Sequence, residues 1–460
     1  MTSDHQRIAV VGGGIAGLAA AHALVTQREA EHQPGVVVFE RDHRFGGKLR
    51  TSPFAGHPAI DEGADAFLAR IPWATELARS VGLEEQLVAP DARSAAVWWG
   101  ALHTIPEGLL LGMPTEILAL ARSGLLSWPG KLRAATEPFR RRSSLEPDSL
   151  GQFVRARFGS EVHYRLVDPL VGSIYAADTD QFSLAAVPQI ADVAARGRSV
   201  LITGRRTPRA SPAAGPVFQT PSEGMGALAA ATAAVVVAAG GELRAQTAVD
   251  RLERDGRGWR VNDEYFDGVV LAAPALAASR LLVDHSPLAA GVLAAIPTAD
   301  VALVTVALDA AEWPARLAGM SGYLVPKPMQ RLVTAASFGS QKWAHWATPG
   351  SVILRISLGR DGLAALHLSD EQLLTAAMDE VGQHLGFAMQ PISNRITRWP
   401  SAFPQYRPHH TTHIEAAQQA LPSGIALAGA SYHGIGVPAC IRSGQQAAEV
   451  MYTFLHSVAE

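Results

Sequence analysis

The chain has 460 residues, 48% hydrophobic and 18% charged, which suits a globular protein of two or three domains with a large buried core. Its 39 basic and 42 acidic side chains give a formal charge of −3, which gives no support to general nucleic-acid binding. The single cysteine, Cys440, excludes an internal disulfide framework and favours a reducing compartment.

The first predicted strand, 8–11, begins too early to leave room for a signal peptide, so we expect a cytoplasmic protein. Glycines follow at 12, 14 and 17, and an Ala-rich helix is predicted over 15–25. This G-x-G-x-x-G spacing is typical of a dinucleotide-binding turn. Gly12 permits the tight turn, Gly14 lets a pyrophosphate approach the backbone, and Gly17 lets the helix pack on its strand. The N-terminus of the helix would face the pyrophosphate.

A second predicted strand, 36–39, ends in Glu40, which is placed to accept hydrogen bonds from an adenosine ribose. An acid at this position disfavours a 2′-phosphorylated nicotinamide cofactor but does not separate NAD from FAD. Strand, glycines, helix, strand and acid in this order predict an α/β fold with a Rossmann-like cofactor domain.

The residues after Glu40, R-D-H-R-F-G-G-K-L-R-T, resemble the R-x-G-G-x-x-x-T signature of FAD enzymes related to amine oxidases. Arg44, Gly46, Gly47 and Thr51 stand at the matching positions. In that superfamily the segment lies along the FAD pyrophosphate and ribose. The resemblance therefore implies tightly bound FAD rather than exchangeable NAD.

The stretch 60–68, I-D-E-G-A-D-A-F-L, is similar to the E-x-G-P-x-S-F-L segment of protoporphyrinogen oxidases. Ala64 replaces the common Pro, and Ala66 replaces the common Ser. In that family the backbone of this segment contacts the flavin ring. Both departures are tolerated if it is the amide groups that bind.

We expect a helical subdomain over 98–195. Its first part, up to residue 142, carries apolar residues too densely for a narrow amphipathic stripe, which predicts a buried or partner-facing helical region. A basic cluster follows, consisting of Lys131, Arg133, Arg140, Arg141 and Arg142. Such a cluster suits anionic lipid, substrate carboxylates, or simply a solvated face.

Further along, 168–184 resembles another block of the protoporphyrinogen oxidases, P-L-x-x-G-x-Y-A-x-D-x-x-x-L-S-L. Residues 196–216 are rich in Arg, Pro, Ser and Gly and are predicted to form a mobile loop. The apolar segment 227–239 falls short of the ~20 residues that span a bilayer, so we expect a core helix and no transmembrane segment.

Predicted strands at 245–252, 258–261 and 267–271 look like the returning part of the FAD domain, in which the position of Val249 meets the adenine. Four more, at 301–308, 322–326, 331–338 and 351–358, predict the mixed sheet of a substrate domain.

The C-terminal part combines a strand, a Gly-rich turn at 434–438 and a helix entered near Ala439. A second helix N-terminus can stabilise negative charge on a reduced flavin. The resemblance to protoporphyrinogen oxidases is close here and implies flavin contacts at the turn. Cys440 is expected to be a small buried thiol rather than a flavin attachment point.

The resemblance covers nearly the whole chain. It implies a discontinuous FAD-binding domain (1–75, 217–285 and 415–460), a substrate domain (76–97 and 286–414) and the helical subdomain. The expected FAD contacts are Gly12, Gly13, Gly14, Ile15, Ala16, Gly17, Glu40, Arg41, Gly47, Lys48, Gly63, Ala64, Asp65, Ala66, Val249, Trp399, Ile435, Gly436 and Val437. We predict no metal ligand and name no catalytic residue, because the flavin carries the chemistry.

The resemblance to bacterial porphyrinogen oxidases implies six-electron oxidation of a porphyrinogen in haem biosynthesis, with dioxygen reoxidising FAD and hydrogen peroxide as by-product. Similarity to actinobacterial and firmicute members favours coproporphyrinogen III. Protoporphyrinogen IX is the alternative, followed by another flavin amine oxidase or desaturase reaction and by a flavin-free binding protein. Candidate propionate partners, by position only, are Arg70, Arg331, Lys342 and Arg355. Transient contact with other haem-synthesis enzymes and peripheral membrane contact are further expectations.

Overall fold

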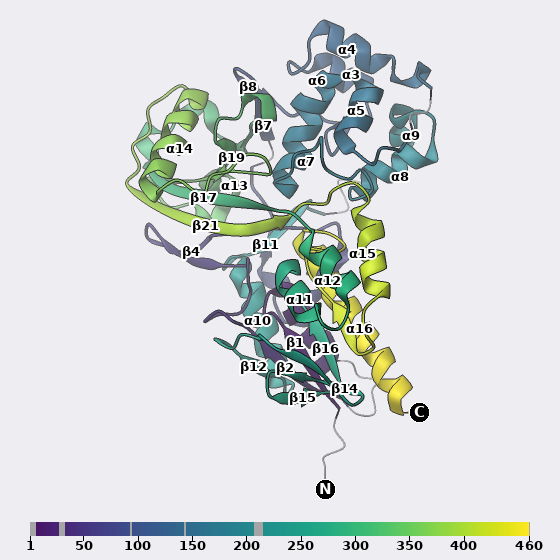
Figure 1. Cartoon of the computed structure of the whole chain (residues 1–460). Coiled ribbons are helices and arrows are strands. Elements are labelled where there is room, and N and C mark those ends of the chain that lie inside the picture. The colour runs from purple at the N-terminus through teal and green to yellow at the C-terminus, as the bar shows by residue number, and fades with distance from the viewer. Residues whose placement is uncertain (1–5, 27–32, 93, 142–143, 207–214, 460) are drawn as a thin grey trace.

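The computed structural model describes residues 6–26, 33–92, 94–141, 144–206 and 215–459. Figure 1 shows three regions: a parallel sheet wrapped by helices near the two termini, a mixed sheet above it, and a group of helices beside the mixed sheet. We call them the cofactor, sheet and helical domains. No helix within the described ranges is long and apolar enough to cross a membrane.

The cofactor domain is built on a five-stranded sheet in which all neighbouring strands are parallel. In order across the sheet they are β12 (Glu242–Arg244), β2 (Gly35–Phe39), β1 (Arg7–Val11), β16 (Gly268–Leu271) and β22 (Ile425–Leu427). Along β1, Ile8 and Val10 enter one hydrophobic core, whereas Ala9 and Val11 enter another. Both faces are buried, as consecutive apolar residues predict for a parallel sheet.

Helices cover both faces of this sheet. One core contains residues of α1 (Ile15–Thr26), α2 (Pro72–Ser80), α10 (Met225–Ala238) and α16 (Val437–Ala459). The other contains residues of α11 (Ala275–Leu282), α12 (Pro287–Ala294), α15 (His410–Gln419) and the antiparallel strands β13 (Leu252–Asp255), β14 (Gly258–Val261) and β15 (Glu264–Phe266). Parts of α2, α12 and α15 lie in ranges that we expected to belong to the substrate domain.

The strand predicted at 245–252 is wrong. Strand β12 ends before this stretch, and β13 begins only at its last residue. Between them the amides of Gln246 and Thr247 donate to the carbonyls of Asp42 and Glu40, each at 2.8 Å. The backbone here is therefore satisfied by the loop that follows β2 and not by a sheet partner.

The sheet domain contains a seven-stranded sheet that is antiparallel except where β18 runs parallel to β7. Its order is β21 (Ser393–Pro404), β17 (Thr298–Asp309), β20 (Ser351–Leu358), β19 (Val333–Phe338), β18 (Met320–Leu324), β7 (Ser94–Trp98) and β8 (Leu102–Thr104). The four strands predicted for this sheet are confirmed as β17, β18, β19 and β20.

The two faces of this sheet meet different neighbours. Val304 and Val306 of β17 share a core with α14 (Asp370–Leu385). On the opposite face, Ala307 packs with Phe54 of β3 (Thr51–Phe54) and Ile60 of β4 (His57–Asp61). The short helix α13 (Gly339–Lys342) follows β19. The face opposite α14 therefore borders the segment that leads out of the cofactor domain.

The helical domain has its own core of buried side chains. Its helices are α3 (Ile117–Arg122), α4 (Trp128–Ala135), α5 (Leu150–Phe158), α6 (Ser160–Val162), a π-helical turn (His163–Val167), α7 (Asp168–Tyr175), α8 (Pro188–Arg196) and α9 (Val200–Arg206). The helix α9 corrects part of the loop predicted at 196–216. It forms because Val200 and Leu201 are buried in this core. Residues 207–214 of that prediction lie outside the described residues.

The first part of the expected helical region is also corrected. Residues 98–114 form short strands joined by turns, because β7 and β8 extend the mixed sheet and β9 (Leu109–Leu110) pairs with β10 (Met113–Pro114). Leu111 and Gly112 have φ values of 48° and 86°, as a two-residue hairpin turn requires. A smaller sheet joins β5 (Phe67–Leu68), β11 (Phe218–Pro221) and β6 (Leu87–Val88).

Candidate functional site

The glycine turn between β1 and α1 combines tight packing with open space. A Cβ on Gly17 would lie 1.9 Å from the Gly12 carbonyl oxygen, and one on Gly12 would lie 2.8 Å from the Ala272 backbone. A Cβ on Gly14 would meet no heavy atom within 4 Å. Only the space beside Gly14, at the N-terminus of α1, is free to receive a pyrophosphate.

Glu40 closes one side of the turn. Its buried carboxylate accepts hydrogen bonds from the amides of Gly13 at 2.8 Å and Asp42 at 2.9 Å. Each oxygen retains acceptor capacity, which suits the ribose hydroxyls expected there. The chain at 245–249 passes beside Glu40, which brings Val249 to this edge, whereas the side chain of Arg41 is exposed.

The R-x-G-G segment packs directly on the glycine turn. The Gly46 amide donates to the Gly13 carbonyl at 2.8 Å, and a Cβ on Gly47 would approach the Gly14 Cα to 3.1 Å. The Arg44 guanidinium donates to carbonyls of its own loop, among them that of Leu49 at 3.3 Å. Arg44 therefore shapes this loop and is already engaged.

Three segments far apart in sequence converge at Lys48. A Cβ on Gly63 would lie 2.1 Å from the Lys48 carbonyl oxygen, so only glycine allows this approach. The Lys48 ammonium donates to the Ala402 carbonyl, and the Trp399 indole donates to the Glu62 carbonyl at 2.7 Å. Burial lowers the pKa of Lys48, although its side chain remains accessible. Lys48 therefore joins the segment 62–63 to β21.

Asp65 fastens the expected flavin-contacting segment to the sheet domain. Its carboxylate accepts hydrogen bonds from Lys342 at 2.8 Å and the Trp343 indole at 3.2 Å, and it lies 3.7 Å from Arg355. Arg355 also donates to the Gly63 carbonyl. Burial alone would raise the pKa of Asp65, but the charges of Lys342 and Arg355 outweigh it and the pKa is lowered.

This arrangement separates the four candidate propionate partners. Lys342 and Arg355 lie together and are engaged with Asp65, whereas Arg70 and Arg331 are exposed. Within the described part of the chain, neither exposed arginine has a contact with the Asp65 cluster. The structure therefore does not bring the four together.

The remaining residues of the segment connect two cores. Ala64 packs against the core of the cofactor domain, and Ala66 packs against the core that contains Trp343 and Trp346. The side chains of Ala64 and Ala66 thus pack against two different cores. The backbone of the segment is therefore the part that can contact the expected flavin ring.

The C-terminal turn lies at the start of α16. Val437 is buried in the cofactor domain, whereas Ile435 packs against the core of the helical domain. A Cβ on Gly436 would have one neighbour within 4 Å, the Pro438 Cδ at 3.8 Å. Helix α16 packs on α1 through Gly444, whose Cβ would lie 2.1 Å from the Ala16 carbonyl oxygen. The two helix N-termini are thereby held in one unit.

Cys440 is a free, buried thiol. Its Sγ donates a weak hydrogen bond to the Ile435 carbonyl at 3.5 Å. Burial raises the pKa of the thiol to about 11, so it is uncharged at neutral pH and a poor nucleophile. This agrees with the expected packing role.

Sequence reasoning missed several polar residues beside the segment 60–66. Arg395 donates to the Ser52 hydroxyl at 2.7 Å and to the Ile60 carbonyl at 3.2 Å, and Thr397 donates to the Glu62 carboxylate at 3.2 Å. Arg395, Thr397 and Trp399 alternate along β21 and share one face. The R-x-T-x-W pattern was the available signal.

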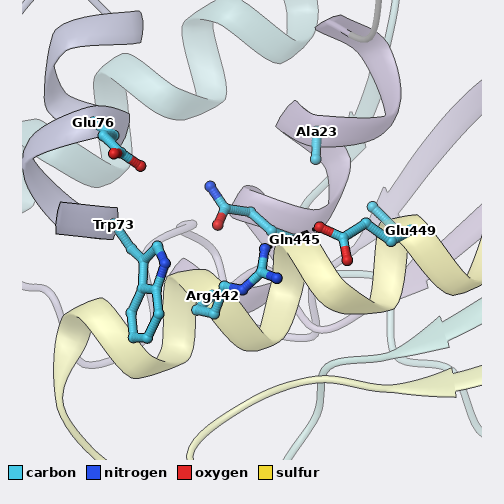
Figure 2. A pocket seen from close by; sticks show the side chains of 7 residues that line it. Ala23, Trp73, Glu76, Arg442, Gln445 and Glu449 are labelled. Carbon is cyan, nitrogen blue, oxygen red and sulfur yellow. Dashed lines mark hydrogen bonds and ion pairs between the residues drawn. The ribbon is translucent and has the colours of Figure 1, made fainter. Parts of the chain in front are cut away.

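A surface groove of about 470 Å³ lies elsewhere, between α1, α2 and α16. Figure 2 shows Trp73 and Glu76 on α2 facing Arg442, Gln445 and Glu449 on α16, where Arg442 pairs with Glu449 at 2.9 Å. The groove reaches α1 only at Ala23, about two helical turns beyond the glycine turn. It is therefore not part of the expected cofactor site. Among the described residues, no group of three or more His, Cys, Asp or Glu side chains is arranged to hold a metal.

Residues 15–452 match the family model described as flavin containing amine oxidoreductase. This match spans the glycine-turn helix, the mixed sheet and α16. The open space beside Gly14 and the close approaches of Gly47 to Gly14 and of Gly63 to Lys48 agree with a flavin-binding site.

Relatives match over almost the full length. The coproporphyrinogen III oxidase of Bacillus subtilis is 29% identical, covering 99% of this chain and 100% of that protein. The coproporphyrinogen III oxidase of Propionibacterium freudenreichii is 32% identical, covering 97% and 91%. The crystal structure of a provisionally named protoporphyrinogen oxidase from Exiguobacterium sp. 255-15 has a TM-score of 0.85 and 29% identity, covering 99% and 100%.

Proposed function

Because the chain belongs to the flavin-containing amine oxidoreductase family, we propose that it oxidises coproporphyrinogen III to coproporphyrin III in haem synthesis, with FAD as its cofactor. The observation that carries this proposal is the full-length match to coproporphyrinogen III oxidases of two bacterial genera.

In the proposed reaction the porphyrinogen loses six electrons and six protons, and three molecules of dioxygen become three of hydrogen peroxide. When bound, FAD accepts the electrons in pairs and passes them to dioxygen. The amides at the start of α1 would bind the pyrophosphate, and Glu40 would bind the ribose. The backbone of 63–66 and the turn at 435–437 would orient the ring.

Two features of the protein support a preformed place for the flavin ring. The segment 62–66 is held by donors from Trp399, Trp343 and Arg355, so its backbone is rigid before any ligand arrives. Lys48 lies beside it with a lowered pKa, and its ammonium is directed to a carbonyl of β21. We assign no general base, because no side chain is shown next to a reacting carbon.

The choice of coproporphyrinogen rests partly on charge. This substrate carries four propionates and protoporphyrinogen carries two. Each charge-assisted hydrogen bond in a desolvated site is worth about 1.5–3 kcal/mol. The absence of one such hydrogen bond from the transition state would lower kcat/KM by roughly 10- to 150-fold.

The test is oxidation of coproporphyrinogen III and protoporphyrinogen IX side by side, with porphyrin fluorescence and peroxide as readouts. We expect the higher kcat/KM for coproporphyrinogen and three peroxides per porphyrin. The Gly14→Val variant, which should lack flavin, controls for spontaneous oxidation. The first assays should omit detergent, and both substrates must be shown to be monomeric.

Equal or better turnover of protoporphyrinogen IX would favour the alternative, for which the name of the Exiguobacterium protein is the supporting observation. Turnover of neither porphyrinogen by FAD-loaded protein would leave the family membership intact. An amine oxidase or desaturase reaction would then be the next candidate.

An exposed apolar patch supports peripheral contact with an anionic membrane. Leu118, Trp128, Leu132 and Phe139 are 74%, 74%, 68% and 84% exposed. Trp128 and Leu132 share a face of α4, and Lys131 lies over the Trp128 ring at 5.0 Å. Aromatic side chains beside basic ones suit the interface of an anionic bilayer.

The rest of the basic cluster divides into two groups. Arg140 and Arg141 are exposed, whereas Arg133 donates to the carbonyls of 155–157 and Arg142 lies outside the described residues.

Co-sedimentation with phosphatidylglycerol vesicles should decrease for a Trp128→Ser/Phe139→Ser double variant and with rising salt. No binding by the wild-type protein would remove this role for the patch.

We place the enzyme in the cytoplasm, where dioxygen is its electron acceptor and contacts with other haem-synthesis enzymes are transient. Fractionation of cells that produce the protein, with and without added salt, tests its location. Crosslinking in the same cells tests the enzyme contacts.

A further inference from the structure

We propose that Tyr406 is a positioning residue that shapes the glycine-rich turn at 434–437 for flavin binding and ties that turn to the helical domain. The inference depends on flavin binding and not on which porphyrinogen is oxidised. Tyr406 follows β21 and precedes α15, so it belongs to none of the segments expected to contact FAD.

The Tyr406 hydroxyl bridges two backbone groups in the chain between β22 and α16. It accepts a hydrogen bond from the Gly434 amide at 3.0 Å and donates one to the Ala430 carbonyl. The tyrosine is only 2% exposed, so water competes little for these bonds. The hydroxyl therefore fixes the distance across 430–434, immediately before the expected flavin contacts.

The other hydrogen bonds to the turn are accepted by its carbonyl groups. Gly434 has a φ of 138°, and a Cβ there would lie 2.7 Å from the Ala439 Cβ. The Cys440 thiol contacts the Gly434 carbonyl at 3.9 Å and the Ile435 carbonyl at 3.5 Å, and the Cys440 amide donates to the Gly436 carbonyl at 3.0 Å. Among the described residues, Tyr406 is the hydrogen-bond partner of the Gly434 amide. The amide at the start of the turn is therefore held by one hydroxyl group.

The ring that carries this hydroxyl is held by other parts of the fold. It stacks on His410 at 4.1 Å with an interplanar angle of 13°, and on Phe182 at 5.9 Å with an angle of 16°. The Tyr406 carbonyl accepts from the Ser183 amide at 2.8 Å. Phe182 and Ser183 belong to the helical domain, so the packing of that domain sets where the hydroxyl lies.

His410 is suited to be a stacking partner. It is buried, and burial lowers its pKa to about 4. Its ring is therefore uncharged at neutral pH. The stack then behaves as an aromatic pair without a charge that would pull Tyr406 out of place.

The test is Tyr406→Phe, which keeps the ring and removes only the hydroxyl. Titration of deflavinated protein with FAD should show a dissociation constant raised about 10-fold or more, as loss of one or two buried hydrogen bonds predicts. The visible circular dichroism of the bound flavin should also change. A purely structural role would lower the melting temperature with and without FAD and leave the dissociation constant unchanged.

Tyr175→Phe is the matched control. Tyr175 belongs to the same aromatic group, 4.8 Å from Phe182 and 6.5 Å from Tyr406, but its hydroxyl has no hydrogen-bond partner among the described residues. This variant should bind FAD as the wild type does. Wild-type affinity and circular dichroism in Tyr406→Phe would overturn the proposal.

A second variant tests the link to the helical domain and covers the case in which Tyr406→Phe fails to fold. Phe182→Leu leaves the hydroxyl in place but removes its aromatic support. It should raise the FAD dissociation constant in the same direction, although Phe182 lies in another domain. An unchanged dissociation constant would refute the coupling.

Discussion

Two glycines in the turn before α1 serve different physical purposes. Gly17 allows the backbone of the helix to meet the backbone of the turn, because a Cβ there would lie 1.9 Å from an oxygen atom. Gly14 has no protein atom near its missing Cβ, and its φ is not in the left-handed region. The fold requires Gly17, whereas Gly14 is expected to serve the ligand.

We therefore predict that Gly14→Val abolishes FAD binding while the protein still folds. The added side chain would fill the space that the pyrophosphate needs. Gly17→Val should instead prevent correct folding. Circular dichroism and FAD titration of both variants distinguish these outcomes, and wild-type FAD affinity in Gly14→Val would contradict the site.

Asp61 is a buried carboxyl with one oxygen that lacks a partner among the described residues. Burial raises its pKa to about 6, against the stabilising effect of hydrogen bonds from Thr51 and the Met225 amide. In the unfolded chain the pKa is about 4. The folded state therefore holds a proton that the unfolded state has lost, over the range between these values.

It follows that the contribution of Asp61 to stability is present near pH 4 and is lost as the pH rises through about 6. The loss is about 3 kcal/mol, because one pKa unit is worth about 1.4 kcal/mol. Between pH 4 and pH 7, the free energy of unfolding of the Asp61→Asn variant should rise by this amount relative to that of the wild type. Urea unfolding at several pH values measures the difference in free energy of unfolding between the two proteins. A difference that does not change with pH would contradict the prediction.

At the scale of elements, a buried ion pair connects α7 of the helical domain to the chain that follows β20. Arg360 lies 2.9 Å from Asp168, and both are almost fully buried. Asp168 also accepts from the Thr179 hydroxyl at 2.7 Å and the Lys327 amide at 3.2 Å. The carboxylate thus joins the helical domain to two segments of the sheet domain.

Removing one partner of this pair should be costly. Arg360→Met leaves a buried carboxylate without its countercharge, which should lower the free energy of unfolding by about 3–5 kcal/mol. The double variant Asp168→Asn/Arg360→Met should recover much of the loss. Arg79→Met is the control, because the Arg79–Glu84 pair is exposed and worth at most about 1 kcal/mol. Equal effects of Arg360→Met and Arg79→Met in urea unfolding would contradict this account.

At the scale of the whole molecule, the expected flavin contacts come from segments spread between residues 12 and 437, and they touch all three domains. Ligand binding to such a site should stabilise the chain as a unit. FAD at 100 times its dissociation constant should add about 2.7 kcal/mol to the free energy of unfolding.

The melting temperature should therefore rise with FAD concentration in wild-type protein. It should stay constant in Gly14→Val, which serves as the control. A melting temperature independent of FAD in the wild type would mean that the folded protein does not bind FAD in preference to the unfolded chain.

Local patterns were sufficient for much of the architecture. The glycine spacing, Glu40 and the R-x-G-G segment predicted the turn, its helix and the acid that closes it. Alternating and continuous apolar runs predicted the strands β17 to β20. These patterns could be recognised in the sequence because each depends on residues that are close together along the chain. The same reasoning failed at 98–114 and 245–252, where the backbone bonds with segments distant in sequence: β7 pairs with β18, and residues 246 and 247 bond to residues 42 and 40.

Other features were decided only by tertiary packing. Asp65 meets Lys342 across 277 positions, Arg355 donates to Gly63 across 292, and Tyr406 reaches Gly434 from a different domain segment. No periodicity encodes such contacts, because they depend on how separate domains dock. The sequence by itself determined the cofactor fold and the class of chemistry. The packing of three domains decided which cations are engaged and which hydroxyl group meets the Gly434 amide, since charge and hydrogen-bond partners are set by proximity in space.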